Sequence, residues 1–334
     1  MNFKLYIQLF NIISTFCFKQ PIPFADSSLS KQGIHKVAIP GNEDVAVWWS
    51  MKDQKWNAVH DMCPHRQASL SDGLINPKTN DIRCRYHGLE FNGCGKCTSI
   101  PVNKMDTDIF SVKNLVVEEK YDILWLIDDD INIPRIDILE QPTYYISKWA
   151  SFIEDINYDL LNENFFDPLH VQQVHHGVLP FLNRYHTKFD LNLSKKIDYF
   201  NEAGFSFSVT NLNTKGKVQV EFMGPSIIIT KFQNFAIVTI VTELKNNSCF
   251  STSSFIFYTK NKIEKKLVEL FFNPINFIIK NLASKIFYQD VDIIKQQQKY
   301  VNKYGKQYTN AGMIDLPITL YNKWLKKYGD EEQS

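Results

Sequence analysis

The sequence predicts an α+β fold divided between two domains. Its 334 residues exceed the usual size of one domain, and 44% of them are hydrophobic, which is enough to bury a large core. The first third is patterned as short strands separated by turns. Residues 217–260 alternate between apolar and polar positions, whereas residues 268–304 read as helix. Strands followed by helix are typical of the α+β class.

The first domain is expected to cover residues 33–135. Apolar runs that read as strands occupy residues 45–49, 56–59 and 123–127. An acidic run at residues 128–130, followed by Pro134 and Pro142, then predicts a boundary, because prolines and polar clusters interrupt regular structure.

The second domain is expected to cover residues 136–334. Residues 152–174 look helical, with a local disturbance at Pro168, which removes a backbone donor. An antiparallel meander is predicted from four runs of alternating residues, at 218–222, 226–230, 236–241 and 254–258.

Composition excludes two classes of protein. The 37 basic and 36 acidic residues leave a formal net charge of +1, which does not favour nucleic-acid binding. Six cysteines are too few for a disulfide scaffold in a chain of this length. Four of them share one short stretch with histidines, which indicates metal binding before disulfides. These four are Cys63, Cys84, Cys94 and Cys97, whereas Cys17 and Cys249 stand alone.

The N-terminal segment, residues 1–32, has two open interpretations. Residues 5–18 are largely apolar but too short to span a bilayer as a helix. The segment is either a targeting peptide or a mis-assigned start. The best later candidate for a membrane span, residues 267–287, is interrupted by lysines, asparagines and a proline, so no transmembrane helix is expected.

The first motif with clear chemistry pairs one cysteine with one histidine in each of two short segments. Cys63 and His65 form C-x-H, and Cys84 and His87 form C-x-x-H. In a Rieske [2Fe–2S] cluster, thiolates hold one iron and two imidazoles hold the other, which raises the reduction potential. Such a potential suits a group that accepts an electron from a donor protein and passes it to a more oxidising site.

Zinc is the main alternative for these four ligands, because two cysteines and two histidines also form a zinc site. Zinc-finger spacing places the two cysteines together, however, and here each cysteine is paired with a histidine. Nearby, Cys94 and Cys97 form a C-x-x-C pair. It is interpreted as two thiols packed in a turn, in preference to a redox-active dithiol, because no thioredoxin-like unit surrounds it.

A second group of metal-ligand residues lies in the second domain. On an irregular helix, His170 and His175 can converge on one ion. Two histidines and one carboxylate form the facial triad of non-haem Fe(II) oxygenases. The carboxylate must come from elsewhere, and Asp290 and Asp292 are the candidates, with Asp290 preferred. His176 is the spare histidine.

These motifs resemble the Rieske non-haem iron oxygenase family from about Val37 onward. They look most like the chloroplast and cyanobacterial branch that contains pheophorbide a oxygenase, protochlorophyllide oxygenase and the Rieske protein of the inner-envelope translocon. The segments that carry the resemblance are residues 56–66, 84–101, 163–176 and 308–329.

The resemblance implies two cofactors, a [2Fe–2S] Rieske cluster and a mononuclear non-haem Fe(II). The implied cluster ligands are Cys63, His65, Cys84 and His87, and the implied iron ligands are His170, His175 and Asp290. Asp167 would be a catalytic residue that links a cluster histidine of one subunit to an iron ligand of its neighbour. The implied fold is an antiparallel β Rieske domain followed by a helix-grip (START-like) catalytic domain with an antiparallel sheet and a long C-terminal helix. It would assemble head-to-tail as a homotrimer.

The implied activity is O2-dependent oxygenation of a bulky hydrophobic substrate, first of all a chlorin of chlorophyll catabolism. Ferredoxin or a reductase would donate the electrons. Two alternatives remain open. The same machinery could act on a sterol or an aromatic acid, or the chain could be a non-enzymatic electron-transfer or redox-sensing subunit.

The branch implies a plastid or cyanobacterial thylakoid-associated location, with peripheral membrane association left open. The sequence departs from the branch at both ends. Residues 1–32 stand where the family has a tryptophan-containing opening segment, and no membrane helices or redox dithiol follow Gly329. The resemblance therefore supports neither integral anchoring nor thioredoxin control.

Overall fold

The computed structural model separates into two units, Met1–Arg135 and Ile136–Ser334. It describes residues 20–40, 43–101, 106–127, 132–167, 170–175, 193–211, 216–307 and 315–328. Several interpreted features lie outside the described residues, namely residues 5–18 with Cys17, the acidic run 128–130, His176, and residues 308–314 and 329 of the last resembling segment.

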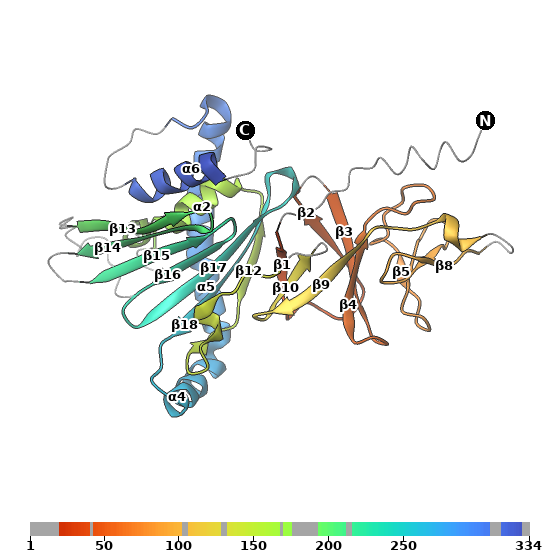
Figure 1. Ribbon diagram of the computed structural model, residues 1–334, viewed down its shortest axis with the longest axis horizontal. Coiled ribbons are helices and arrows are strands. Elements are labelled where there is room, and N and C mark those ends of the chain that lie inside the picture. The colour runs from red at the N-terminus through yellow and green to blue at the C-terminus, as the bar shows by residue number, and fades with distance from the viewer. Residues whose placement is uncertain are drawn as a thin grey trace. The chain divides into compact units, whose positions relative to one another are not determined.

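The first unit contains two antiparallel sheets (Figure 1). Its larger sheet has the strand order β1-β10-β9-β4-β3-β2, and the smaller has the order β5-β6-β7-β8. The strands are β1 Ile22–Asp26, β2 Ile34–Ile39, β3 Glu43–Ser50, β4 Lys55–His60, β5 Leu74–Ile75, β6 Ile82–Arg83, β7 Glu90–Phe91, β8 Cys97–Ser99, β9 Asn114–Lys120 and β10 Ile123–Ile127, with one 3-10 turn at Thr107–Ile109.

Strand β3 explains how the cysteine loops are held. Its continuous apolar run is typical of a strand buried on both faces. Val45 and Val47 pack into one hydrophobic cluster. Ala46 and Trp48 point the other way, into a second cluster that also contains both loop cysteines. One face of the larger sheet therefore supports the two cysteine–histidine loops.

The described sheet begins earlier than the sequence indicated. Strand β1 pairs with β10 antiparallel, with Ile22 opposite Leu126, so residues before 33 belong to the first unit. The expected domain start at residue 33 is too late. The strand is short and contains Pro23 beside an irregular register, so it lacks the alternation by which longer strands are recognised.

The second unit is one antiparallel sheet with helices. Its strand order is β11-β18-β17-β16-β15-β14-β13, and β12 also pairs with β18. The strands are β11 Tyr145–Ile146, β12 Ala150–Glu154, β13 Leu193–Asn201, β14 Gly204–Asn211, β15 Lys217–Met223, β16 Ile227–Lys231, β17 Phe235–Glu243 and β18 Cys249–Phe257. The helices are α2 Tyr158–Phe166, α3 His170–Val174, α4 Lys262–Phe272, α5 Asn276–Tyr304 and α6 Leu316–Tyr328, with 3-10 turns at Asp137–Glu140, Lys245–Asn247 and Asn273–Ile275.

The prediction of helix across residues 152–174 was partly wrong. Phe152 lies in β12, opposite Ser251 of β18. Helix α2 begins only at Tyr158, where the Asn157 side chain accepts from the Leu160 N–H as an N-cap. The apolar residues 152–153 form a strand instead of a helix, because they pair with the edge of β18.

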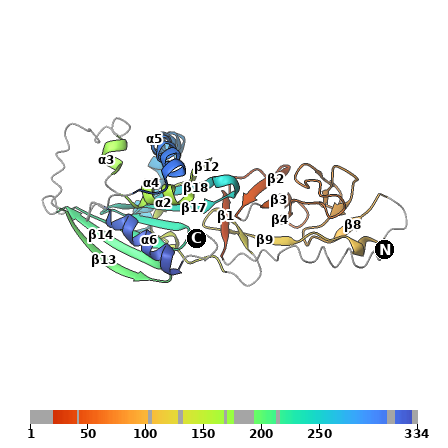
Figure 2. The same ribbon diagram turned by 90° about the horizontal axis from the view of Figure 1, so that it is seen from above.

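Helix α5 carries Asp290, and its packing fixes the position of this carboxylate. Phe287, Val291 and Ile294 of α5 pack with Leu160 and Leu161 of α2 in one hydrophobic cluster. Phe166, at the end of α2, enters a neighbouring cluster with aromatic residues of β14, β15 and α6. Figure 2 shows α3 beside α5. Among the described residues, no helix combines the length and apolar character needed to span a membrane.

Candidate metal centres

The two cysteine–histidine loops of the first unit share one backbone design. In each loop, the cysteine N–H donates to the carbonyl five residues later, at 2.9 Å from Cys63 and 2.8 Å from Cys84. The cysteine carbonyl accepts from the N–H four residues later, at 2.8 and 3.0 Å respectively. That fourth residue has a positive φ in both loops, +57° at Gln67 and +74° at Gly88. The loops are therefore matching turns, although their sequences differ.

The side chains of the two loops divide by exposure. Cys63 and Cys84 are both buried, with 2% of each residue exposed to solvent. His65 and His87 are exposed, and their ring centroids lie 4.7 Å apart with the rings tilted by 69°. Two inner thiols and two outer imidazoles match the donor set of a Rieske cluster, in which each pair holds its own iron.

The electrostatics of these loops favour a bound metal. Burial raises the pKa of the Cys63 thiol to about 11, and the neighbouring Cys84 thiol acts in the same direction. Burial lowers the pKa of His65, with help from His87 and Arg66. The imidazole is thus held neutral, which is its metal-binding form, while a buried thiolate pair needs a cation to compensate its charge.

Cys94 and Cys97 do not share one environment. Cys97 is buried in the same hydrophobic cluster as Cys63 and Cys84, and Cys94 is exposed. Both are free thiols, and burial raises the pKa of Cys97. Cys97 therefore helps to fill the core beneath the cluster loops.

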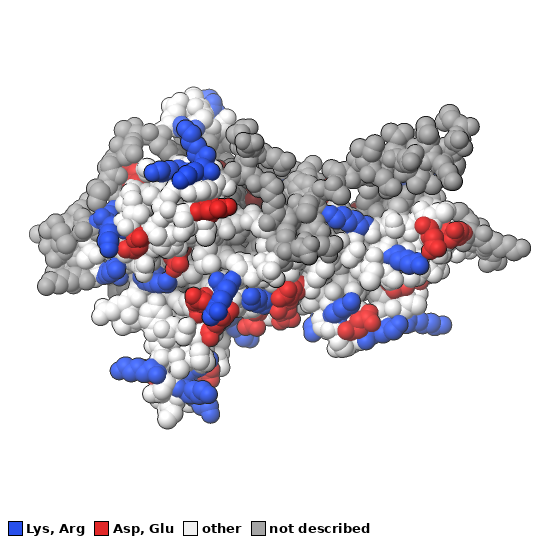
Figure 3. All heavy atoms as spheres, viewed as in Figure 1, with Lys and Arg blue, Asp and Glu red and all other residues white. Residues whose placement is uncertain are grey.

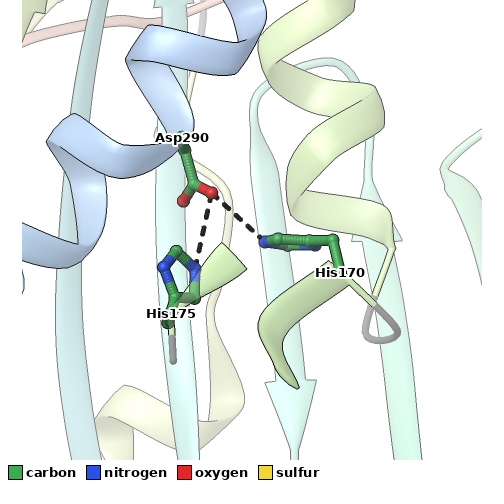
Figure 4. A group of neighbouring side chains, drawn as sticks. All are labelled: His170, His175 and Asp290. Carbon is green, nitrogen blue, oxygen red and sulfur yellow. Dashed lines mark ion pairs between the residues drawn. The ribbon is translucent and has the colours of Figure 1, made fainter. Parts of the chain in front are cut away.

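In the second unit, His170, His175 and Asp290 come together (Figure 4). Nε2 of each histidine lies 3.4 Å from Oδ1 of Asp290, and the three ligand atoms all lie within 4.8 Å of one another. Two adjacent ligand atoms on one first-row divalent metal ion are roughly 3 Å apart. His175 and Asp290 are almost fully buried, each at 3% exposure. The group could hold a metal ion.

Hydrogen bonds at the far side of each imidazole fix which nitrogen faces the site. Nδ1 of His170 donates to the main-chain carbonyl of Asp167, and Nδ1 of His175 donates to Oε1 of Gln289 at 3.1 Å. Because both Nδ1 atoms carry hydrogen, both Nε2 atoms present lone pairs to Asp290 in the neutral state. Three acceptors that face one another in such a site need positive charge between them, which either a metal ion or protons on the imidazoles would supply.

The pKa values show the same attraction for positive charge. Burial opposes ionisation of Asp290, but hydrogen bonds from His170 and His175 outweigh it and lower the pKa of the carboxyl. For His170, burial acts to lower the pKa, and the contacts with Asp290 outweigh it and raise the value. The carboxylate is charged, and a divalent cation among these groups would satisfy all three.

The remaining candidates from the sequence separate clearly. Asp292 is exposed on α5, two residues beyond Asp290, and its side chain does not join the buried group. Asp167 ends α2 and contacts His170 through its main-chain carbonyl, so this contact does not depend on the carboxylate.

Sequence reasoning missed two polar side chains at this site. Gln289 accepts from His175, and Asn164 of α2 donates through Nδ2 to Oδ1 of Asp290 at 3.5 Å. Oδ1 of Asn164 is buried without a hydrogen-bond partner among the described residues. No sequence pattern marked either side chain as part of the site.

The segment that contains the two cysteine–histidine loops matches a known domain family. Residues 22–115 match the Rieske [2Fe-2S] domain family. The chain is 30% identical over 204 residues to the protochlorophyllide-dependent translocon component 52 of Arabidopsis thaliana, covering 52% of this chain and 36% of the relative. It is 32% identical over 154 residues to the pheophorbide a oxygenase of the same plant, covering 40% of this chain and 28% of the relative. The matches thus span about a third of the length of these relatives.

The fold also matches a solved structure along almost its whole length. Dicamba monooxygenase bound to dicamba superimposes with a TM-score of 0.75 at 19% identity, covering 96% of this chain and 100% of that one. At this identity, the match concerns the fold, and it extends through both units. The expected α+β fold, with an antiparallel Rieske domain and a second sheet-and-helix domain, is confirmed. The chain therefore carries a Rieske [2Fe–2S] domain, and its sequence is similar to pheophorbide a oxygenase and to a chloroplast translocon component.

Proposed function

We propose that this protein is an O2-dependent Rieske oxygenase that acts on a bulky hydrophobic substrate, most specifically a chlorophyll-derived chlorin. The observation that carries the oxygenase activity is the buried group of His170, His175 and Asp290 in a chain that also has a Rieske domain. A pure electron carrier needs no second metal centre of this kind. The chlorin rests on the family branch alone.

The proposal assigns the cluster to Cys63, His65, Cys84 and His87, and the mononuclear iron to His170, His175 and Asp290. When bound, the cluster would supply electrons and the iron would activate O2. The protein's part is to position these groups and to exclude water. Gln289 and the Asp167 carbonyl hold the two imidazoles with Nε2 inward, and Asn164 holds the carboxylate.

The proposal extends to a head-to-tail homotrimer. His65 and His87 are exposed in the single chain, so they are accessible to another subunit. Asp167 follows α2 and lies three residues before His170, where its carboxylate would connect a partner's cluster histidine with this chain's iron site. Ferredoxin or a reductase would supply electrons, and the chloroplast relatives support a plastid or cyanobacterial thylakoid-associated location.

Metal analysis and turnover test the proposal together. Anaerobically purified protein should contain about three irons per chain, two from the cluster and one from the mononuclear site. The protein should then be incubated with O2, a ferredoxin system and a pigment extract, and the products read by mass spectrometry. Two irons per chain and no oxygenated product would instead identify an electron carrier. Oxygenation of a sterol or an aromatic acid, with the pigments untouched, would keep the activity and change the substrate.

A further inference from the structure

Helix α4 presents its apolar residues to solvent. Ile263, Leu267, Leu270 and Phe271 are 74%, 63%, 75% and 67% exposed. At 100° per residue, these four positions fall within an arc of about 100° on one side of the helix. A surface helix normally turns such a stripe toward the protein core. This one turns it outward.

The opposite side of α4 is already anchored to the protein. Phe272 packs against Phe257 of β18 with ring centroids 4.6 Å apart, and Lys265 donates to the carbonyl of Pro142 at 3.2 Å. Asn261 caps the helix by accepting from two N–H groups. The orientation of α4 is therefore set by contacts on the side opposite the apolar stripe, and the stripe is left without cover in the described chain.

Charge is distributed unevenly around the stripe. Lys262 and Lys266 are exposed along one edge, whereas Glu264 and Glu269 are half-buried. Glu264 is further occupied by accepting from the Lys260 N–H at 2.7 Å. Figure 3 shows uncharged surface edged by Lys or Arg side chains over the lower end of this unit, where Figure 1 places α4.

We propose that α4 is a membrane-surface helix that lies in the interface of an anionic lipid bilayer. An exposed apolar arc containing leucine and phenylalanine, bordered on one edge by lysines, is what such a surface binds, because acyl chains accept the apolar side chains and headgroup anions attract the ammonium groups. A protein partner that covered only apolar side chains would leave the lysine edge unexplained. The proposal does not depend on the oxygenase activity.

Vesicle flotation with the full-length protein tests this inference. Vesicles of phosphatidylcholine with phosphatidylglycerol should carry the protein upward, and pure phosphatidylcholine should carry much less. The double substitution Leu267→Glu/Leu270→Glu should weaken binding to the anionic vesicles by at least about tenfold. Lys262→Gln/Lys266→Gln should weaken it by about tenfold on anionic vesicles and leave the weak binding to neutral vesicles unchanged.

A matched control comes from the other unit. Leu74 is 69% exposed, so Leu74→Glu removes an equally exposed leucine and should leave vesicle binding intact. Circular dichroism and the visible spectrum of the cluster should be unchanged in all variants, which separates loss of binding from loss of folding or cofactor. Absence of flotation in the unmodified protein, or equal loss in Leu74→Glu, would overturn the proposal. So would an oligomer that dissociates in Leu267→Glu/Leu270→Glu, because a second copy would then cover this face.

Discussion

The two candidate metal centres are built from different kinds of structure. The centre in the first unit uses two short loops, each held by its own main-chain hydrogen bonds, with buried cysteines and exposed histidines. The centre in the second unit joins the α3 segment to α5, so more than a hundred residues separate its two histidines from Asp290. His175 and Asp290 are buried and His170 is partly exposed, and side chains from α2 and α5 complete the hydrogen bonding.

This difference has a functional meaning. An exposed pair of imidazoles suits electron exchange with other proteins, because an electron can pass without opening the structure. A buried set of two imidazoles and a carboxylate suits chemistry from which water must be excluded. The first centre should therefore depend mainly on its loops and the sheet face beneath them, whereas the second should respond to changes in the helices around it.

The largest effect is expected for Cys84→Ser. A neutral hydroxyl is a poor iron ligand compared with a thiolate, so the cluster and all turnover should be lost. The reduced unmodified protein should give a rhombic EPR signal with the low average g value of a histidine-ligated cluster, and the variant should give none. Cys94→Ser is the control, since Cys94 is exposed and is not a proposed ligand. An EPR-silent, fully zinc-loaded protein would contradict the cluster assignment.

Asp290→Ala should affect only the second centre. Removal of the carboxylate should release the mononuclear iron and abolish oxygenation while the EPR signal of the cluster remains. Asp292→Ala is the matched control two residues away, because that side chain is exposed, and its effect on stability should stay within about 0.5 kcal/mol. Iron loss in Asp292→Ala with retention in Asp290→Ala would move the ligand to Asp292.

Asp167→Asn examines the proposed connection between the centres. Both the cluster and the iron should remain, because the structural contact of Asp167 with His170 uses the main-chain carbonyl, which asparagine also has. Turnover should nevertheless fall by about a hundredfold or more, since a neutral amide cannot replace a carboxylate that bridges two imidazoles. Single-turnover kinetics with a pre-reduced cluster should place the loss in electron transfer. Loss of iron from this variant would make Asp167 a ligand.

The two centres also differ in how far the sequence could predict them. The proposed cluster ligands lie within two short motifs, so their spacing alone was enough to propose them. The proposed third iron ligand had two candidates on α5. The apolar positions Phe287, Val291 and Ile294 favoured Asp290, and the structure buries these three side chains in one cluster. The partners Asn164 and Gln289 carry no distinctive pattern, because an amide on a helix is usually solvated.

For the fold as well, the sequence predicted the elements with a regular pattern and missed those that depend on contacts between distant segments. Residues 217–260 alternate and were predicted as four strands, and β15 to β18 are present. The role of Phe152 could not be predicted, because its strand exists only where β18 offers an edge. The outward stripe of α4 was equally unpredictable. Periodicity shows that a helix is amphipathic, but the direction of its apolar side depends on contacts such as those of Phe272.

Gln289→Ala should weaken the second centre without destroying it. The substitution removes the acceptor that orients His175, so iron affinity should fall by about 10- to 100-fold. Titration of iron into the apo-protein, followed by calorimetry, would measure the change. Tyr288→Ala is a suitable control, since the neighbouring Tyr288 is half exposed. An unchanged affinity in Gln289→Ala would mean that helix packing alone orients the imidazole.

The smallest effects concern the matching turns of the first centre. Gly88 has φ +74°, and a Cβ there would come within 3.1 Å of the Pro101 side chain. Gly88→Ala should therefore destabilise the unit by about 1–2 kcal/mol, the cost of a left-handed conformation for a residue with a Cβ.

Gln67 already carries this cost at φ +57°. Gln67→Gly should change stability by less than about 1 kcal/mol, because relief of the left-handed conformation is offset by the greater freedom of glycine in the unfolded chain. Urea unfolding, followed by tryptophan fluorescence and by the visible absorption of the cluster, would measure both. Loss of the cluster in Gln67→Gly but not in Gly88→Ala would show that the two loops are not equivalent turns. The Gln67 side chain itself would then help to hold the cluster.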